Sequence, residues 1–302
     1  MDFVKILGCG SALPVKDRNP SAQALKHKER FYLIDCGEGT QVRLREAKIS
    51  FSKIDHIFIS HLHGDHFFGL PGLLSSFHLL GRTKQVHLYG PPGLKEILDL
   101  QFKWSATYLN YELVFHPVQS KKKALIFESK SLSVYSFPLN HRIPCTGYLF
   151  EEKPKPAHLI IEKIEAHEVP KFLRANIKKG ADFVMENGTV IPNKELTRPS
   201  SPPVSYAYCS DNRIKTSLKK DLEGVDVLYH ETTFLDSEKV RAKKTYHSTA
   251  QEAAVLAKEL EVKTLITGHY SARYEDLQPL LKECQEVFEN VVLGKEGLEF
   301  KF

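Results

Sequence analysis

The stretch that decides the fold runs from Ile57 to Pro71 and reads Ile57-Phe-Ile-Ser-His-Leu-His-Gly-Asp-His-Phe-Phe-Gly-Leu-Pro71. It begins inside an apolar run from Ile54 to Ile59, interrupted by Asp55 and His56, that predicts a short buried strand. A second apolar run, from Leu70 to Leu80, has the spacing of a helix. The segment between them is rich in side chains that bind metals. The sequence therefore predicts a buried strand that ends in a metal-binding turn.

Three histidines and an aspartate within six residues form the pattern HxHxDH in this turn. His61 and His63 are two apart on an extended chain, so they point the same way and can share one cation. Asp65 and His66 lie at the turn into the helix and can face a second cation. Imidazole suits zinc, and the added carboxylate also accepts manganese or other harder divalent ions. An incidental cluster of histidines is a poor explanation for this pattern directly after a buried strand.

Length and composition limit the remaining possibilities. The 302 residues can form one large domain or two ordinary ones, and 42% hydrophobic residues suffice for a sizeable core. No apolar run approaches the roughly 20 residues that cross a bilayer, and the first residues resemble a strand rather than a signal peptide, so we expect a cytoplasmic protein. The five cysteines have no CxxC spacing, which disfavours a disulfide framework or a cysteine zinc site. A net charge of +5 neither requires nor excludes a polyanionic partner.

Alternation and turn residues predict further elements along the chain. The predicted strands are Phe3–Leu7, Phe31–Ile34, Gln85–Tyr89, Glu112–Phe115, Leu132–Phe137, Cys145–Phe150, Val204–Cys209, Val225–Tyr229 and Lys263–Thr267. The predicted helices are Thr40–Ala47, one from Pro91-Pro-Gly93 to Trp104, and one ending near Leu260. The last helix begins with a capping box, either Ser248 with Gln251 or Thr249 with Glu252.

Residues 151–203 differ in character from the rest of the chain. They are rich in Lys, Glu and Pro, offer little core and contain weak helical patches such as Ile160–His167. We interpret them as an insertion that projects from a single domain spanning residues 1–302. Its middle carries basic side chains without an acid between them: Lys171, Arg174, Lys178 and Lys179.

Several predicted strands end in a metal-binding or acid/base side chain. These side chains are His61, His141, Asp211, His230 and His269. Strand ends that gather along one edge of a sheet are where α/β folds place their chemistry. Together with HxHxDH they indicate a two-metal site, in which Asp211 is the natural bridge between the cations.

The chain resembles a known family at motifs spread over nearly its whole length. They are Gly8-Cys-Gly-Ser-Ala-Leu-Pro14, Pro14-x-Lys16-x-Arg18-Asn19, Asp35-Cys-Gly-Glu-Gly-Thr-Gln41, HxHxDH, Tyr208-Cys-Ser-Asp211, His230-Glu231, His247-Ser-Thr249 and His269-Tyr-Ser-Ala-Arg-Tyr274. HxHxDH with His141, Asp211 and His269 resembles the metallo-β-lactamase superfamily. The complete set resembles the ribonuclease Z family of tRNA 3′-processing endonucleases. The resemblance implies a four-layer αβ/βα sandwich with a protruding arm, and a homodimer.

The resemblance also implies roles for individual residues. His61, His63 and His141 would hold one zinc ion, Asp65, His66 and His269 the other, with Asp211 bridging. Asp65 would orient or deprotonate the attacking water, and His247, held by Glu231, would protonate the leaving 3′-oxygen. His230 would orient a ligand. Lys16 and Arg18 would position phosphates, and residues 151–203 would form the arm that clamps tRNA.

The arm and one site residue depart from the family pattern. The usual glycine-proline tip and glycine-lysine turn appear only loosely, from Val169 to Gly180, and Asn212 replaces a threonine. We expect the arm to bind tRNA nonetheless, because basic residues meet phosphates wherever the tip lies.

The predicted function is a zinc-dependent endoribonuclease that cleaves precursor tRNA after the discriminator nucleotide, leaving a 3′-hydroxyl on the tRNA and a 5′-phosphate on the trailer. One alternative is a small-molecule phosphodiesterase or arylsulfatase on the same scaffold, which would need neither the basic arm nor the Pro14–Asn19 loop. A non-catalytic RNA-binding protein is a further alternative, and the complete ligand set argues against it.

Overall fold

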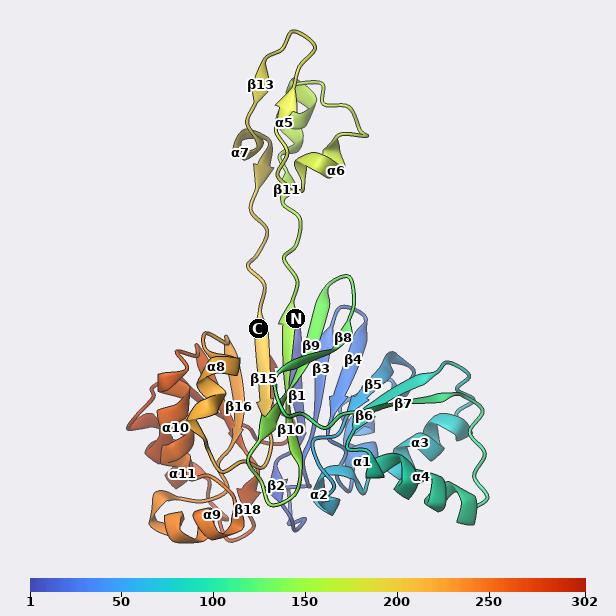
Figure 1. Cartoon of the computed structure of the whole chain (residues 1–302), viewed down its shortest axis with the longest axis vertical. Coiled ribbons are helices and arrows are strands. Elements are labelled where there is room, and N and C mark those ends of the chain that lie inside the picture. The colour runs from blue at the N-terminus through green and yellow to red at the C-terminus, as the bar shows by residue number, and fades with distance from the viewer. The chain divides into compact units, whose positions relative to one another are not determined.

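A computed structural model describes residues 1–302, apart from the side chain of Thr216, and the chain forms two compact units (Figure 1). The main unit comprises Met1–Glu128, Ser133–Phe150 and Ser205–Phe302. The second, which we call the arm unit, comprises Ser129–Leu132 and Glu151–Val204. The arm unit thus contains the predicted insertion, residues 151–203.

Two large mixed sheets form the centre of the main unit. In spatial order the first contains β20 (Glu299–Lys301), β1 (Phe3–Gly8), β3 (Ala22–His27), β4 (Arg30–Ile34), β5 (Ile54–Phe58), β6 (Val86–Gly90) and β7 (Leu113–Pro117). The second contains β19 (Val291–Leu293), β17 (Thr264–Gly268), β16 (Val227–Glu231), β15 (Ser205–Cys209), β10 (Cys145–Glu152), β9 (Leu132–Leu139) and β8 (Ala124–Glu128). The neighbours β4 to β7 run parallel, as do β15, β16, β17 and β19. The short strands β2 (Gly10–Ser11) and β18 (Tyr270–Ser271) pair separately.

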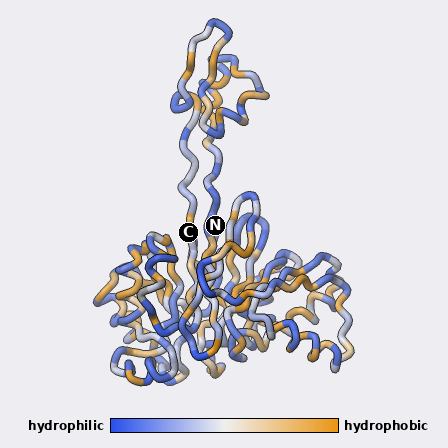
Figure 2. Tube along the Cα trace, in the orientation of Figure 1, coloured by the Kyte–Doolittle hydropathy of each residue, from blue (hydrophilic) through white to orange (hydrophobic). Residues whose placement is uncertain are grey.

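Helices flank each sheet on the side away from the other sheet (Figure 1). Beside the first lie α1 (Thr40–Glu46), α3 (Leu70–Leu79) and α4 (Gly93–Trp104), whereas η1 (Phe51–Lys53) directly precedes β5 and α2 (Gly64–Phe67) follows it. Beside the second lie η2 (Thr216–Leu218), α8 (Lys219–Leu222), η3 (Asp236–Glu238), α9 (Lys239–Thr245), α10 (Ala250–Glu259) and α11 (Gln278–Gln285). Hydrophobic and hydrophilic residues alternate along these outer helices (Figure 2), as expected of helices that bury one face. The predicted four-layer αβ/βα sandwich is confirmed.

Aromatic side chains fill the space between the two sheets. Phe58 of β5 packs edge-on against Tyr148 of β10, with ring centroids 5.3 Å apart. The Tyr148 hydroxyl donates a hydrogen bond to the carbonyl of Ile59 (2.7 Å), and Tyr208 of β15 donates to Asp35 (2.7 Å). Both acceptors lie just beyond strands of the first sheet. The second sheet therefore holds the segments of the first sheet that lead into the HxHxDH turn.

Most predicted elements appear within one or two residues of their expected bounds, and the capping-box alternative is resolved. Glu252 N–H donates to Thr249 Oγ1 (3.2 Å), and Thr249 N–H donates to Glu252 Oε2 (3.0 Å). The sequence interpretation missed β3, in which the polar Gln23 and His27 are nevertheless buried. Gln23 accepts a hydrogen bond from the Tyr206 hydroxyl of the other sheet. A partner that distant in sequence leaves no local pattern.

The arm unit has more internal structure than its composition suggested. It contains β11 (His158–Leu159) paired with β14 (Thr197–Arg198), β12 (Phe183–Val184) paired with β13 (Val190–Ile191), and the helices α5 (Ile161–Ala166), α6 (Arg174–Ile177) and α7 (Asn193–Leu196). In keeping with the expectation of little core, these elements bury one small cluster: Ile164, Val169, Ile177, Phe183, Ile191 and Leu196. Among the described residues of both units, none of the helices has the length and apolar character needed to span a membrane.

Candidate metal centre

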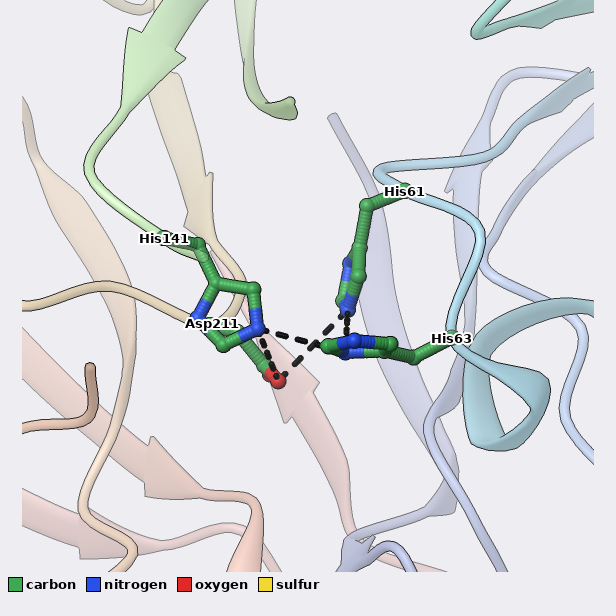
Figure 3. A group of neighbouring side chains, drawn as sticks. All are labelled: His61, His63, His141 and Asp211. Atoms are coloured by element: carbon green, nitrogen blue, oxygen red, sulfur yellow. Dashed lines mark hydrogen bonds and ion pairs between the residues drawn. The ribbon is translucent and has the colours of Figure 1, made fainter. Parts of the chain in front are cut away.

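The histidines and aspartates predicted as metal ligands meet at one edge of the two sheets. His61 and His63 follow β5, Asp65 and His66 lie in α2, His141 follows β9, Asp211 follows β15, and His269 follows β17. Figure 3 shows His61, His63, His141 and Asp211 pointing toward one another from these separate elements. The described residues thus contain donor groups that can hold a cation, including His61–His63–His141–Asp211 and Asp65–His66–His269.

The first donor group has spacings that suit a shared cation. His61 Nε2, His63 Nδ1, His141 Nε2 and Asp211 Oδ2 are separated by 3.1–3.6 Å along the contacts that join them (Figure 3). Donors that lie roughly 2.0–2.1 Å from a tetrahedral zinc ion are about 3.3 Å from one another. These four pairs therefore have the spacing of ligands that share one zinc ion, and all the donor atoms of the group lie within 4.8 Å of one another.

The second donor group has the same spacing and uses the other oxygen of Asp211. His66 Nε2 and His269 Nε2 each lie 3.1–3.4 Å from Asp65 Oδ2 and from Asp211 Oδ1. Within the described part of the chain, His66 Nε2 and Asp211 Oδ1 are buried atoms without a hydrogen-bond partner. Burying unsatisfied polar atoms costs free energy, and a cation between them would remove that cost.

The outward nitrogens of four histidines are held by hydrogen bonds. Each Nδ1 contacts an oxygen: His61 with Ser60 Oγ (3.0 Å), His66 with Asp35 Oδ2 (2.7 Å), His141 with the Tyr246 carbonyl (3.1 Å) and His269 with Thr233 Oγ1 (3.0 Å). A ring that donates its Nδ1–H is fixed in the tautomer whose Nε2 lone pair is free. These four rings therefore present Nε2 to the centre, whereas His63 presents Nδ1.

Burial sets the protonation of the cluster. Burial, helped by the charge of His66, lowers the pKa of His61 to about 4, and burial also lowers the pKa values of His63 and His141. Burial alone would raise the pKa of Asp211, but His269, His66 and His61 hold it well below its usual range. The pKa of Asp65 is lowered in the same way, by His66 and His269 against the effect of burial. His66 is the exception: burial opposes its charge, but Asp65, Asp211 and Asp35 raise its pKa well above the ordinary value. Neutral imidazoles beside ionised carboxylates are the forms that bind metal, so a cation would displace the proton of His66.

His247 and Glu231, predicted as a catalytic pair, lie beside this cluster. His247 Nδ1 is 2.9 Å from Oε1 of the fully buried Glu231 and 4.0 Å from Asp211 Oδ2. Burial opposes protonation of the ring, but Glu231 and Asp211 raise the pKa of His247 to about 9. His247 also forms a donor group with Asp211 and His269. Its longer distance from Asp211 and its contact with Glu231 favour a role outside the metal donor set.

The structure places some predicted residues differently from expectation. His230 lies within β16 rather than beyond its end, and its ring contacts Asn212 and the Glu231 carbonyl, neither of which is a predicted ligand. Its role in orienting a ligand stays a prediction. Lys16 is exposed, whereas Arg18 is only 9% exposed, so of these two residues Lys16 alone presents its charge to solvent. In the arm unit, Lys171, Lys178 and Lys179 are exposed and Arg174 is half-buried.

Asp35 is the important site residue that the sequence interpretation missed. It is buried and accepts hydrogen bonds from Ser60 N–H (2.7 Å), Ser60 Oγ (2.8 Å), His66 Nδ1 (2.7 Å) and Tyr208 (2.7 Å). The sequence interpretation quoted it only as the first residue of a family motif and gave it no role. The signal was available in the sequence: Asp35 directly follows the predicted strand Phe31–Ile34, as the other candidate ligands follow theirs.

Comparisons with known proteins agree with this geometry. The chain is 49% identical over 298 residues to ribonuclease Z of Parabacteroides distasonis, covering 98% of both chains. It is 48% identical over 293 residues to ribonuclease Z of Bacteroides fragilis, covering 97% of this chain and 96% of the relative. Its structure is similar to that of human tRNase Z, short form, with a TM-score of 0.72, 28% identity, and 99% and 98% of the two chains covered.

A family model described as Anti-Pycsar protein Apyc1 matches residues 3–153. That match includes the HxHxDH turn and His141 but ends before Asp211 and His269. The similarity to the two bacterial relatives extends over nearly the whole chain.

Proposed function

Because the chain belongs to the ribonuclease Z family, we propose that it is an endoribonuclease that cleaves precursor tRNA. Its residues 3–153 also belong to the family described as Anti-Pycsar protein Apyc1. The cut falls after the discriminator nucleotide and leaves a 3′-hydroxyl on the tRNA and a 5′-phosphate on the trailer. The observation that carries the proposal is the shared carboxylate Asp211, with one oxygen in each donor group. Two cations joined by such a bridge are typical of enzymes that hydrolyse phosphate esters.

The proposed cofactor is a pair of zinc ions per subunit. His61, His63 and His141 would hold one, Asp65, His66 and His269 the other, and Asp211 both. The predominance of imidazole nitrogens supports zinc, and the carboxylates also accept manganese. When bound, the cations would lower the pKa of the attacking water and stabilise negative charge on the phosphate oxygens.

The remaining chemistry is assigned to three side chains of the site. Asp65 orients the attacking water or accepts its proton, and its own position is held by the Ala12 N–H, which donates to Asp65 Oδ2 (2.9 Å). His247 protonates the leaving 3′-oxygen. Glu231 holds His247 through Nδ1, which leaves Nε2 as the nitrogen that donates the proton.

The arm unit is the proposed tRNA-binding arm. Its basic residues Lys171, Arg174, Lys178 and Lys179 would contact phosphates, as would Lys16 in the main unit. Glu152 N–H donates to the Val204 carbonyl (2.9 Å), so a short linker can replace residues 153–203. We expect this replacement to weaken tRNA binding and to spare hydrolysis of a small phosphodiester. Loss of both activities together would mean that the segment is structural.

The proposed assembly is a homodimer, which would act in the cytoplasm where precursor tRNA is made. Ile97, Leu100 and Trp104 form an apolar stripe on α4, with Trp104 79% exposed. Such a stripe is the kind of surface that a second copy covers. Light scattering after size-exclusion chromatography should give a dimer for the natural chain and for Gln101→Glu, and a monomer for Trp104→Glu. A natural chain that is monomeric at micromolar concentration would refute the homodimer.

The decisive experiment uses a precursor tRNA with a short 3′ trailer, with and without a chelator, and maps the 3′ end of the product. We expect one chelator-sensitive cut directly after the discriminator base. Intact RNA beside chelator-sensitive hydrolysis of a small phosphodiester would instead favour a small-molecule phosphodiesterase on the same scaffold.

A further inference from the structure

A cationic pocket lies at the opposite end of the first sheet from the metal centre. It has a volume of about 690 Å³, within the range of small-molecule sites. Arg30, one of its lining residues, is the first residue of β4, and the lining residues Phe51 and Ser52 precede β5. The metal centre begins at the other end of β5, and six residues of extended chain from Asp55 to His61 span roughly 20 Å. A ligand in this pocket would not touch the metal centre.

The pocket carries more positive charge than its neighbouring acid can neutralise. Asp55 is paired with Arg30 (2.9 Å), Arg82 (2.7 Å) and Lys84 (2.5 Å), so three cations share one carboxylate. Arg45, on α1, lines the same pocket, is exposed, and has no ion-pair partner among the described residues. The described lining residues include no Asp or Glu. An anion is therefore the ligand that the pocket favours.

The cations differ in their freedom to contact a ligand. Arg82 is engaged by Asp55 and by the carbonyls of Phe51, Lys84 and Gln85, so it shapes the wall. Arg30 and Lys84 are each about half exposed at their side chains and contact the same Asp55 oxygen. Together with Arg45 they can surround a phosphate, for which arginine's planar fork is well suited.

The floor of the pocket is apolar and its rim carries hydroxyl groups. The floor consists of Phe51, Phe77 and Ile49, which are all buried, and Leu80, 65% exposed, supplies most of the open apolar surface beside them. Ser50, Ser52 and Thr83 line the pocket as well. A bare inorganic anion would leave this apolar surface uncovered, whereas a ligand with a flat ring and a sugar would cover it and find hydroxyl partners.

We propose that this pocket binds a free nucleoside monophosphate, with its phosphate between Arg45, Arg30 and Lys84 and its base against Phe51 and Leu80. The inference is independent of the proposed endonuclease function, because it uses none of the residues of the metal centre. The metal centre is itself a competing phosphate site, so the test must separate the two locations.

The test is isothermal titration calorimetry, which measures the affinity of the purified full chain for AMP, adenosine and inorganic phosphate at low salt. We expect AMP to bind more tightly than either part alone. Arg45→Ala, which changes an exposed side chain, should weaken AMP binding about tenfold or more. Leu80→Glu places a negative charge on the wall and should abolish binding. Lys48→Asn is the matched control, because Lys48 lies on the same segment outside the pocket lining and Asn tolerates its φ of 55°.

Three results would overturn the proposal. One is the absence of AMP binding by the natural chain at millimolar concentration. Another is AMP binding that survives Arg45→Ala and disappears in Asp211→Asn, which would place the nucleotide at the metal centre. The third is an equal affinity for phosphate and AMP, which would mean that the base makes no favourable contact with the apolar floor.

Discussion

Replacing Asp35 by asparagine tests how the protein holds the second donor group. Asp35 accepts four hydrogen bonds through two oxygens, with Ser60 N–H on Oδ1 and Ser60 Oγ, His66 and Tyr208 on Oδ2. Asparagine has the same shape and tolerates the φ of 55° at this position, so the backbone is not strained. The change removes the negative charge and one acceptor and leaves the packing intact.

The magnitude follows from these contacts. If the amide oxygen takes the place of Oδ2, the amide NH₂ faces the Ser60 N–H, so one hydrogen bond to a charged group is lost, at a cost of about 1.5–3 kcal/mol. The other three bonds lose their charge assistance. We expect the free energy of unfolding to fall by about 2–4 kcal/mol. The affinity for zinc should fall roughly 10–100-fold, because the charged acceptor that orients the His66 ring becomes a neutral amide oxygen.

The assay is zinc competition against a chromophoric chelator, together with urea unfolding of the same preparations. Tyr208→Phe is the matched control, because it removes one donor to Asp35 but leaves the carboxylate on His66. It should keep zinc affinity near that of the natural chain. Natural zinc affinity and unchanged stability in Asp35→Asn would refute the assignment of Asp35 as the residue that positions His66.

Three further predictions concern other parts of the molecule. His247→Ala should keep both metals, measured by elemental analysis, while cleavage slows roughly 10²–10⁴-fold, and loss of metal would instead make His247 a ligand. Joint substitution of Lys178 and Lys179 by alanine should reduce the slope of log affinity for tRNA against log salt by nearly 2, whereas an unchanged slope would remove these residues from the contact surface. Burial alone would raise the pKa of Asp55, but Lys84, Arg82 and Arg30 lower it in the folded chain. The ionised carboxylate therefore stabilises the protein fully at pH values above the ordinary pKa of 3.8. This stabilisation is lost as the pH falls through the lower pKa of the folded chain. Asp55→Asn should therefore destabilise the protein at pH 7 with a difference that shrinks below about pH 4, as urea unfolding at several pH values would show, and a pH-independent difference would contradict the ion-pair explanation.

The sequence by itself determined the elements whose signals are local. The run from Ile54 to Ile59 predicted β5, and HxHxDH predicted a metal-binding turn after it, because neighbours in sequence are neighbours in space there. The capping box of Thr249 and Glu252 was one of the two alternatives that the sequence offered, because its two residues are also close in sequence. The family motifs extended this to the four-layer fold.

Only the tertiary structure decided which atoms meet. The partners of the histidine rings are distant in sequence: Asp35 lies 31 residues before His66, Tyr246 lies 105 residues after His141, and Thr233 lies 36 residues before His269. These contacts select the ring nitrogen that faces the centre, and the packing of two sheets brings both oxygens of Asp211 between the donor groups. The pocket around Arg45 is likewise assembled from separate segments. Local periodicity records which face of an element is buried, but the partner across the core depends on how all the elements pack together.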